Sequence, residues 1–189
     1  MNVQLRNLLV LLLLAFPFAR ALADDYADTI KVFRGAGESG QFFNKCYGYA
    51  VFPTIGKGGI AIGGAYGSGR VYAKGAYVGD SSMAQVTFGL QLGGQAFSQI
   101  IFFEDKRAFD EFTGGNFEFG VQATAVAITA GASAQAGTTG TSAGASGTQQ
   151  AAKTAAKYYK GMAIFTVAKG GLMYEASIGG QKFSYKRKQ

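Results

Sequence analysis

The stretch Gln85–Leu92 (QVTFGLQL) decides the fold class. It alternates apolar residues with polar residues or glycine, and its apolar members are Val86, Phe88, Leu90 and Leu92. A period of two is typical of a β-strand with one face buried and the other in water. We therefore expect a sheet to dominate the fold.

Two further stretches predict strands. Phe97–Phe103 (FSQIIFF) is apolar enough for a deeply buried strand, and Phe117 and Phe119 open another that continues toward Ile128. The predicted fold class is mostly β (α+β): an antiparallel, strongly bent or barrel-like sheet with short helices. Its predicted core consists of Phe52, Ile62, Val86, Phe88, Leu90, Phe102, Ile164 and Phe165.

Two short helices are predicted beside the sheet. Tyr26–Arg34 has helical apolar spacing, with aspartates at its start and glycines after its end. Asp105 can cap a second helix that runs to Phe112, and Gly114 can end it. The pattern GAGESG at 35–40 matches a dinucleotide-binding motif, but it follows a predicted helix instead of a strand, so we expect only a flexible helix terminus.

The composition argues against catalysis. The chain of 189 residues has no histidine, no tryptophan and one cysteine, Cys46, which we expect to be a buried small hydrophobe. Without histidine it cannot form a Ser-His-Asp or Cys-His nucleophile, and one cysteine cannot form an internal disulfide. We therefore predict a non-enzymatic protein with no catalytic residue, no metal site and no cofactor.

Residues 1–23 are typical of a secretory signal peptide. Arg6 precedes an apolar run, Leu8–Phe18, and Ala21–Ala23 has the small residues of a cleavage site. The run of about 11 residues is shorter than the roughly 20 of a membrane-spanning helix, which leaves a signal anchor as the alternative. We expect an exported protein of the periplasm or cell envelope, peripheral to a membrane. Residues 24–189 would form one domain, with a low-complexity loop at about 131–150.

A repeated pattern suggests two related hairpin units. Lys57-Gly58-Gly59 recurs as Lys169-Gly170-Gly171, and the same offset of 112 residues carries Arg70 onto Lys182 and Lys74 onto Lys186. Each copy predicts a strand, a Lys-Gly-Gly turn, a second strand, a glycine hairpin turn and a third strand, with Gly67–Gly69 as the first copy's hairpin turn. Chance similarity between glycine-rich hairpins is the alternative.

The positive charge indicates an anionic partner. Without the predicted signal peptide, 16 basic and 11 acidic residues remain, and eight of the basic ones follow Gln150. Export makes nucleic acid an improbable partner, so anionic lipid headgroups are the polyanion we expect, with ordinary solvating charge as the alternative. The predicted lipid-binding residues are Lys57, Arg70, Lys74, Lys169, Lys182, Lys186, Arg187 and Lys188, in two matched basic patches.

Three stretches resemble the SYLF-domain family of lipid-binding proteins. They are Lys45–Tyr66 (KCYGYAVFPTIGKGGIAIGGAY), Thr87–Phe103 (TFGLQLGGQAFSQIIFF) and Tyr159–Tyr185 (YKGMAIFTVAKGGLMYEASIGGQKFSY). The resemblance implies binding of membrane phospholipids, phosphoinositides among them. In eukaryotic members it also implies a link to actin, which an exported protein would not meet in its own cell. Exported bacterial-type members look like single-domain envelope proteins.

The predicted function is therefore non-catalytic binding of anionic phospholipid at a membrane surface. An outer-membrane β-barrel and an envelope scaffold or interaction protein are the alternatives. The glycine-broken strands and the Lys-Arg-Lys-Gln ending argue against the barrel. The lipid class and the oligomeric state stay open at this point.

Overall fold

The computed structural model describes residues 25–60, 62–88, 95–120, 123, 125–128, 157–169 and 179–189. The predicted signal peptide and the predicted low-complexity loop lie outside the described residues. Within the described ranges, no helix is both long and apolar enough to cross a bilayer.

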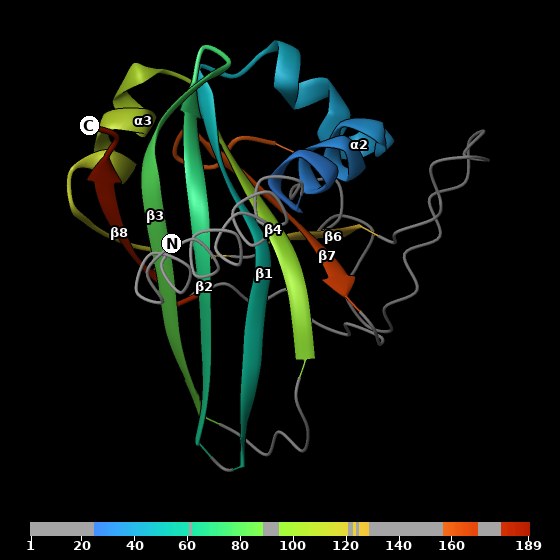
Figure 1. The fold of residues 1–189 in the computed structure, drawn as a ribbon, viewed down its shortest axis with the longest axis vertical. Coiled ribbons are helices and arrows are strands. Elements are labelled where there is room, and N and C mark those ends of the chain that lie inside the picture. The colour runs from blue at the N-terminus through green and yellow to red at the C-terminus, as the bar shows by residue number, and fades with distance from the viewer. Residues whose placement is uncertain are drawn as a thin grey trace, which may run out of the picture.

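The described strands form one open, mostly antiparallel sheet, which confirms the predicted mostly β (α+β) class (Figure 1). The strand order is β5-β8-β3-β2-β1-β4-β7-β6, and only β6 runs parallel to its neighbour, β7. The strands are β1 (Gly48–Ile60), β2 (Ile62–Ala73), β3 (Ala76–Phe88), β4 (Gln95–Phe103), β5 (Asn116–Glu118), β6 (Val126–Ile128), β7 (Met162–Lys169) and β8 (Lys182–Arg187).

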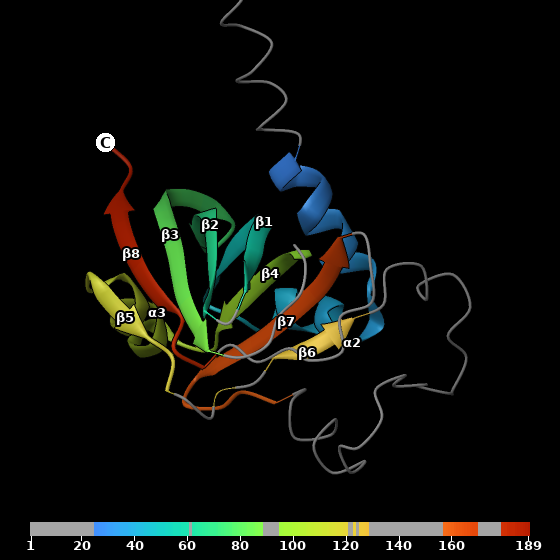
Figure 2. The same cartoon turned by 90° about the horizontal axis from the view of Figure 1, so that it is seen from below.

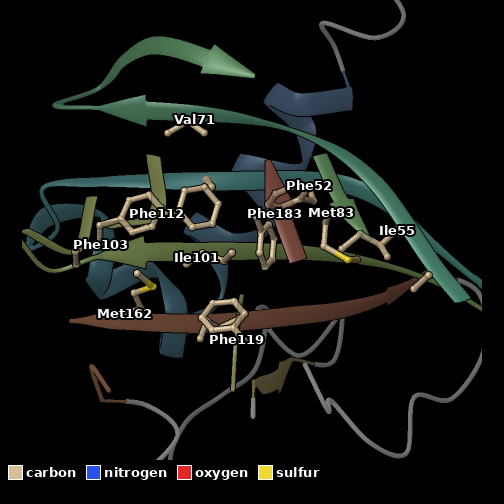
Figure 3. Packing of buried hydrophobic residues seen from close by; sticks show 14 of the residues in the cluster. Phe52, Ile55, Val71, Met83, Ile101, Phe103, Phe112, Phe119, Met162 and Phe183 are labelled. Atoms are coloured by element: carbon tan, nitrogen blue, oxygen red, sulfur yellow. The ribbon is translucent and has the colours of Figure 1, made fainter. Parts of the chain in front are cut away.

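The sheet is strongly curled, and each of its two faces buries its own core. On the inner face, Phe52 of β1 meets Phe183 of β8 with 5.5 Å between ring centroids, although β2 and β3 separate these strands in the sheet. Figure 2 shows the curl end-on, and Figure 3 shows the side chains that fill it. The inner core consists of Ala50, Phe52, Ile55, Ala65, Val71, Met83, Phe97, Ile101, Phe103, Ala108, Phe112, Phe119, Met162, Ile164 and Phe183.

Helices complete both cores. α3 (Lys106–Thr113) buries Ala108 and Phe112 in the inner core, and Asp105 caps it by accepting a hydrogen bond from the Ala108 amide at 2.8 Å. This helix and its Gly114 end are as predicted. The outer core lies under a helix at 25–35, α2 (Gly37–Gly40) and the 3₁₀ helix η1 (Gln41–Asn44). It consists of Phe33, Phe42, Tyr49, Val51, Ile100, Phe102, Val126, Ala163, Phe165 and Val167.

Glycines of β2 make room for the inner core. A Cβ atom on Gly69 would lie 2.5 Å from ring carbons of Phe52, and one on Gly67 would lie 2.6 Å from Cγ1 of Ile55. The large side chains of β1 therefore lie over β2, which lets the sheet curl. The prediction of a hairpin turn at Gly67–Gly69 is wrong, because these residues lie inside β2.

The turn between β2 and β3 lies instead at Lys74 and Gly75. Both residues have positive φ, 49° and 81°, as a two-residue turn of type I′ requires. Their flanking residues, Ala73 and Ala76, are directly paired. Lys74 is thus a turn residue and does not share a strand face with Arg70, contrary to the prediction.

The predicted pair of hairpin units is also wrong. The first copy does form a hairpin, β1–β2, but Lys57 lies within β1 opposite Ala65, not in a turn. In the second copy, the predicted Lys-Gly-Gly turn after Lys169 and the predicted middle strand lie outside the described residues. Its described strands do not pair with each other: β7 pairs with β4 and β6, whereas β8 pairs with β3 and β5.

The predicted core is largely confirmed where the structure describes it. Phe52, Phe102, Ile164 and Phe165 are buried, whereas Val86 is 63% exposed. In the described part of the stretch 85–92 the predicted strand is present but its faces are reversed, because Gln85 points inward and donates from Nε2 to the Gly179 carbonyl at 2.9 Å. Leu90 and the side chains of Ile62 and Phe88 lie outside the described part.

A buried amide pair crosses the inner core. Gln99 of β4 donates from Nε2 to Oε1 of Gln181 at 2.9 Å, and Gln181 returns a bond at 3.2 Å. Both residues are fully buried. The pair links β4 to the residue before β8 and so stabilises the curl from one side to the other.

One segment supplies both edges of the sheet. β5 pairs with β8 at one edge, and β6 pairs with β7 at the other. Phe119 extends the first edge through backbone hydrogen bonds with Gln181 and Gly180. The two edge strands are separated by only the seven residues 119–125, so the chain between them cannot span more than about 28 Å.

Candidate anion-binding site on the outer face

Strand register brings three distant charged residues into one row on the outer face. Arg70 of β2 is directly opposite Asp80 of β3, and Asp80 is directly opposite Lys186 of β8. The next row of the same face consists of three serines, Ser68, Ser82 and Ser184.

Aromatic rings contact Arg70 of this row and Lys188, which lies just beyond it on the chain. The guanidinium of Arg70 lies 4.3 Å from the ring centroid of Tyr26 and 5.2 Å from that of Tyr77. The ammonium of Lys188 lies 5.0 Å from the same Tyr77 ring. Such cation–π contacts orient a charged group without neutralising it. We name this group the Arg70 cluster, and its members are Tyr26, Arg70, Tyr77, Asp80, Lys186 and Lys188.

A pocket of about 330 Å³ lies beside the cluster. Its lining residues are Tyr26, Ser68, Gly69, Asp80, Ser81, Ser82, Ser184 and Lys186. The hydroxyls of Ser82 and Ser184 are 2.7 Å apart, and Ser81 donates to the Ser184 carbonyl at 2.7 Å. Hydroxyl groups can rotate to donate to an anion, so serine hydroxyls beside an ammonium suit a phosphate oxygen.

The phenols of the cluster stay protonated near neutral pH. Burial, and then a hydrogen bond with Asp80, raise the pKa of Tyr77 to about 12. Burial also raises the pKa of Tyr26, against the opposing effect of Arg70. The cluster therefore combines three cations with one carboxylate and carries a net positive charge.

Of the other predicted basic residues, four lie apart from this cluster, and Arg187, which lies between Lys186 and Lys188 in the chain, alternates to the opposite face of β8. Lys182, one row beyond the serines, is 3.6 Å from Glu118, and Lys169 donates to Oγ1 of Thr54 at 2.9 Å. Lys57 shares the inner face with Ala65, Lys74 stands over the Tyr47 ring, and Arg187 is exposed at the end of β8. The two matched basic patches are not formed; Arg70, Lys186 and Lys188 gather in one.

Sequence reasoning missed the partners of these cations. Tyr26, Tyr77, Asp80 and the serines come from four separate segments, and they meet only because β3 pairs with both β2 and β8 and the helix at 25–35 packs against this face. The alternation of Asp80 and Ser82 along β3 was a signal for one polar face, but it does not say which strand lies opposite.

A second pocket, of about 410 Å³, lies near η1 and is lined by Gln41, Phe42, Lys45, Glu104, Lys157 and Tyr158. It is larger, but Glu104 opposes its two lysines, and none of its residues was among the predicted ones. Cys46 lies close by and is half-buried against the outer core, where burial raises the pKa of its thiol.

Comparison with known proteins gives two matches. Residues 84–189, more than half of the chain, match the family model Ysc84, described as "Las17-binding protein actin regulator". A protein of Aeromonas veronii, "Beta cell expansion factor A", is 30% identical over 171 residues, which cover 87% of this chain and 56% of the relative. The chain thus spans little more than half of that relative's length. The family match confirms the resemblance found in the sequence: the chain belongs to the Ysc84, or SYLF-domain, family.

Proposed function

We propose that this protein binds anionic phospholipid at a membrane surface, without catalysis, as an exported component of the cell envelope. Membership of the Ysc84 family supports a lipid-binding or actin-regulator-related role. The observation that carries the finer proposal is the Arg70 cluster. In it Lys186 lines a pocket together with Ser82 and Ser184, while Arg70 and Lys188 lie over the aromatic rings of the same cluster.

The chemistry of the cluster fits a lipid phosphate. Near an anionic membrane each lysine or arginine contributes about 1 kcal/mol, so three together contribute roughly 3 kcal/mol. The serine hydroxyls add directional donors, and Asp80 repels a second negative charge placed against it. The pocket therefore favours a single phosphate group presented at a surface.

Sedimentation with vesicles of varied phosphatidylglycerol content tests this proposal. We expect the triple variant Arg70→Gln, Lys186→Gln, Lys188→Gln to bind roughly 100-fold more weakly than the parent. The matched control, Lys31→Gln, Lys106→Gln, Lys160→Gln, removes the same charge from exposed positions elsewhere and should lose far less.

Salt provides the second measurement. Raising the salt concentration from 0.1 M to 1 M shortens the Debye length from about 10 Å to about 3 Å and should weaken parent binding. Equal losses in the two triple variants, or parent binding that ignores both anionic lipid and salt, would contradict the proposal.

A further inference from the structure

The outer face of β2 and β3 changes polarity steadily along the strands. Beyond the row of Arg70, Asp80 and Lys186 comes the serine row, and then a row formed by Tyr66, Ala84 and Lys182. At the β8 edge of this third row, Glu118 of β5 is directly opposite Lys182 and forms an ion pair with it at 3.6 Å. The last row of this face whose side chains are described pairs Gly64 with Val86. From one end of the face to the other, the rows are charged, hydroxyl, aromatic with a lysine–glutamate pair at one edge, and apolar.

The apolar end of this face is exposed. Tyr66 is 61% exposed and Val86 is 63% exposed, and they are diagonal neighbours on adjacent strands. On the β1 side they are flanked by Gly56 and Gly58, which have no side chains to cover them. The helices of the outer core lie over the other end, around Phe33 and Phe42.

We propose that this face inserts shallowly into an anionic bilayer, with Tyr66 and Val86 at the acyl boundary and the Arg70 cluster among the phosphates. The inference rests on the proposed function and adds the surface and its orientation. A bilayer interface has the same order of polarity, from acyl chains through a zone that favours tyrosine to charged headgroups. Lys182 and Glu118, 3.6 Å apart, lie at the β8 edge of the aromatic row, where their long side chains keep the ion pair at the level of the headgroups.

The spacing of the rows sets the tilt of the strands. Val86 and Asp80 are six residues apart on β3, which is about 20 Å along a strand. Each polar interface of a bilayer is only about 5–8 Å thick. Both rows can reach their zones only if the strands lie oblique to the membrane, with the Val86 end deeper.

A single introduced tryptophan tests the insertion, because the chain has none of its own. We expect Tyr66→Trp to shift its fluorescence to the blue on phosphatidylglycerol-containing vesicles and to be quenched at least about twofold by brominated acyl chains. The matched control is Tyr159→Trp, which changes a tyrosine that is 70% exposed and lies just before β7, not on β2 or β3. The emission wavelength of its tryptophan should not change when vesicles are added.

A second pair of variants measures the apolar contribution. We expect Val86→Ser to weaken the vesicle binding that remains at 1 M salt by about tenfold, because charge attraction is then screened and apolar burial dominates. Val32→Ser changes an exposed valine of the helix at 25–35 and should leave that binding unchanged. Equal binding of the two valine variants would overturn the proposal.

The outcomes separate this inference from the proposed function. If Tyr66→Trp sediments with vesicles but its tryptophan stays in water, the insertion is wrong and surface binding stands. If the parent does not sediment with any vesicle, the proposed function fails and the insertion fails with it. A blue shift without vesicles that grows with protein concentration would mean that the face binds a second copy of the chain, which also overturns the insertion.

Discussion

Replacing Gly69 by alanine tests whether close approach of β1 side chains to β2 sustains the curl. The new methyl group would lie 2.5 Å from two ring carbons of Phe52, a fully buried residue that packs on Phe183. Since the contact is with the ring near its attachment and not with a free end, relief requires the ring or a strand to move. Overpacking of this kind costs typically 1–3 kcal/mol.

We expect Gly69→Ala to lower the free energy of unfolding by about 2 kcal/mol, which for a chain of this size lowers Tm by about 4–8 °C. Urea denaturation and thermal melting measure both quantities. The matched control is Gly56→Ala in β1, where a Cβ atom would meet nothing within 4 Å and stability should change by less than about 0.5 kcal/mol.

A compensating change sharpens the test. We expect Phe52→Leu to lower the free energy of unfolding less in the Gly69→Ala variant than in the parent, because the smaller side chain leaves room for the methyl group. If Gly69→Ala proved as stable as Gly56→Ala, the ring of Phe52 would be free to move, and the reasoning that ties these glycines to the curl would be refuted.

Three further predictions concern stability. Gln99→Leu should cost about 2 kcal/mol because it leaves the buried amide of Gln181 without its partner, and a double-mutant cycle in urea should show that adding Gln181→Leu costs less than the sum of the single changes. Asp105→Ala should lower the free energy of unfolding by about 1 kcal/mol through loss of the α3 cap, and an equal cost for Asp105→Asn would argue against capping. Burial raises the pKa of Tyr49 to about 12, so folding favours the neutral form of its phenol. The contribution of this effect to the free energy of unfolding is fully present below pH 10 and is lost as the pH rises through 12. Denaturation curves of Tyr49→Phe should therefore change less with pH above 10 than those of the parent.

Local patterns in the sequence predicted individual helices and strands, whereas the strand faces and the site depend on pairing between distant parts of the chain. β4 and α3 were predictable because apolar runs and an Asp cap act within a few residues. The faces of β3 were not, since a period of two is the same whether Val86 or Gln85 points inward. The rows of the Arg70 cluster depend on pairing between β3 and β8, which are about a hundred residues apart in the chain.

Glycine was the residue type that misled most. Gly67 and Gly69 have the spacing of a hairpin turn, yet they lie within β2 because Ile55 and Phe52 need the space that a Cβ atom would fill. A turn and a close approach both select glycine, and nothing in the neighbouring residues tells them apart. The turn itself is at Lys74-Gly75, a dipeptide in which only the second residue is a strong turn former.

The shared origin of the two edge strands bears on self-association. β5 and β6 are three residues each, so each covers only part of its neighbour and offers another chain a very short template for pairing. Because both come from residues 116–128, a deletion of that segment would uncover β8 and β7 together. Each would then present unpaired N–H and C=O groups to a further copy of the chain. The integrity of this one short segment therefore protects the protein from edge-to-edge aggregation at both ends of its sheet.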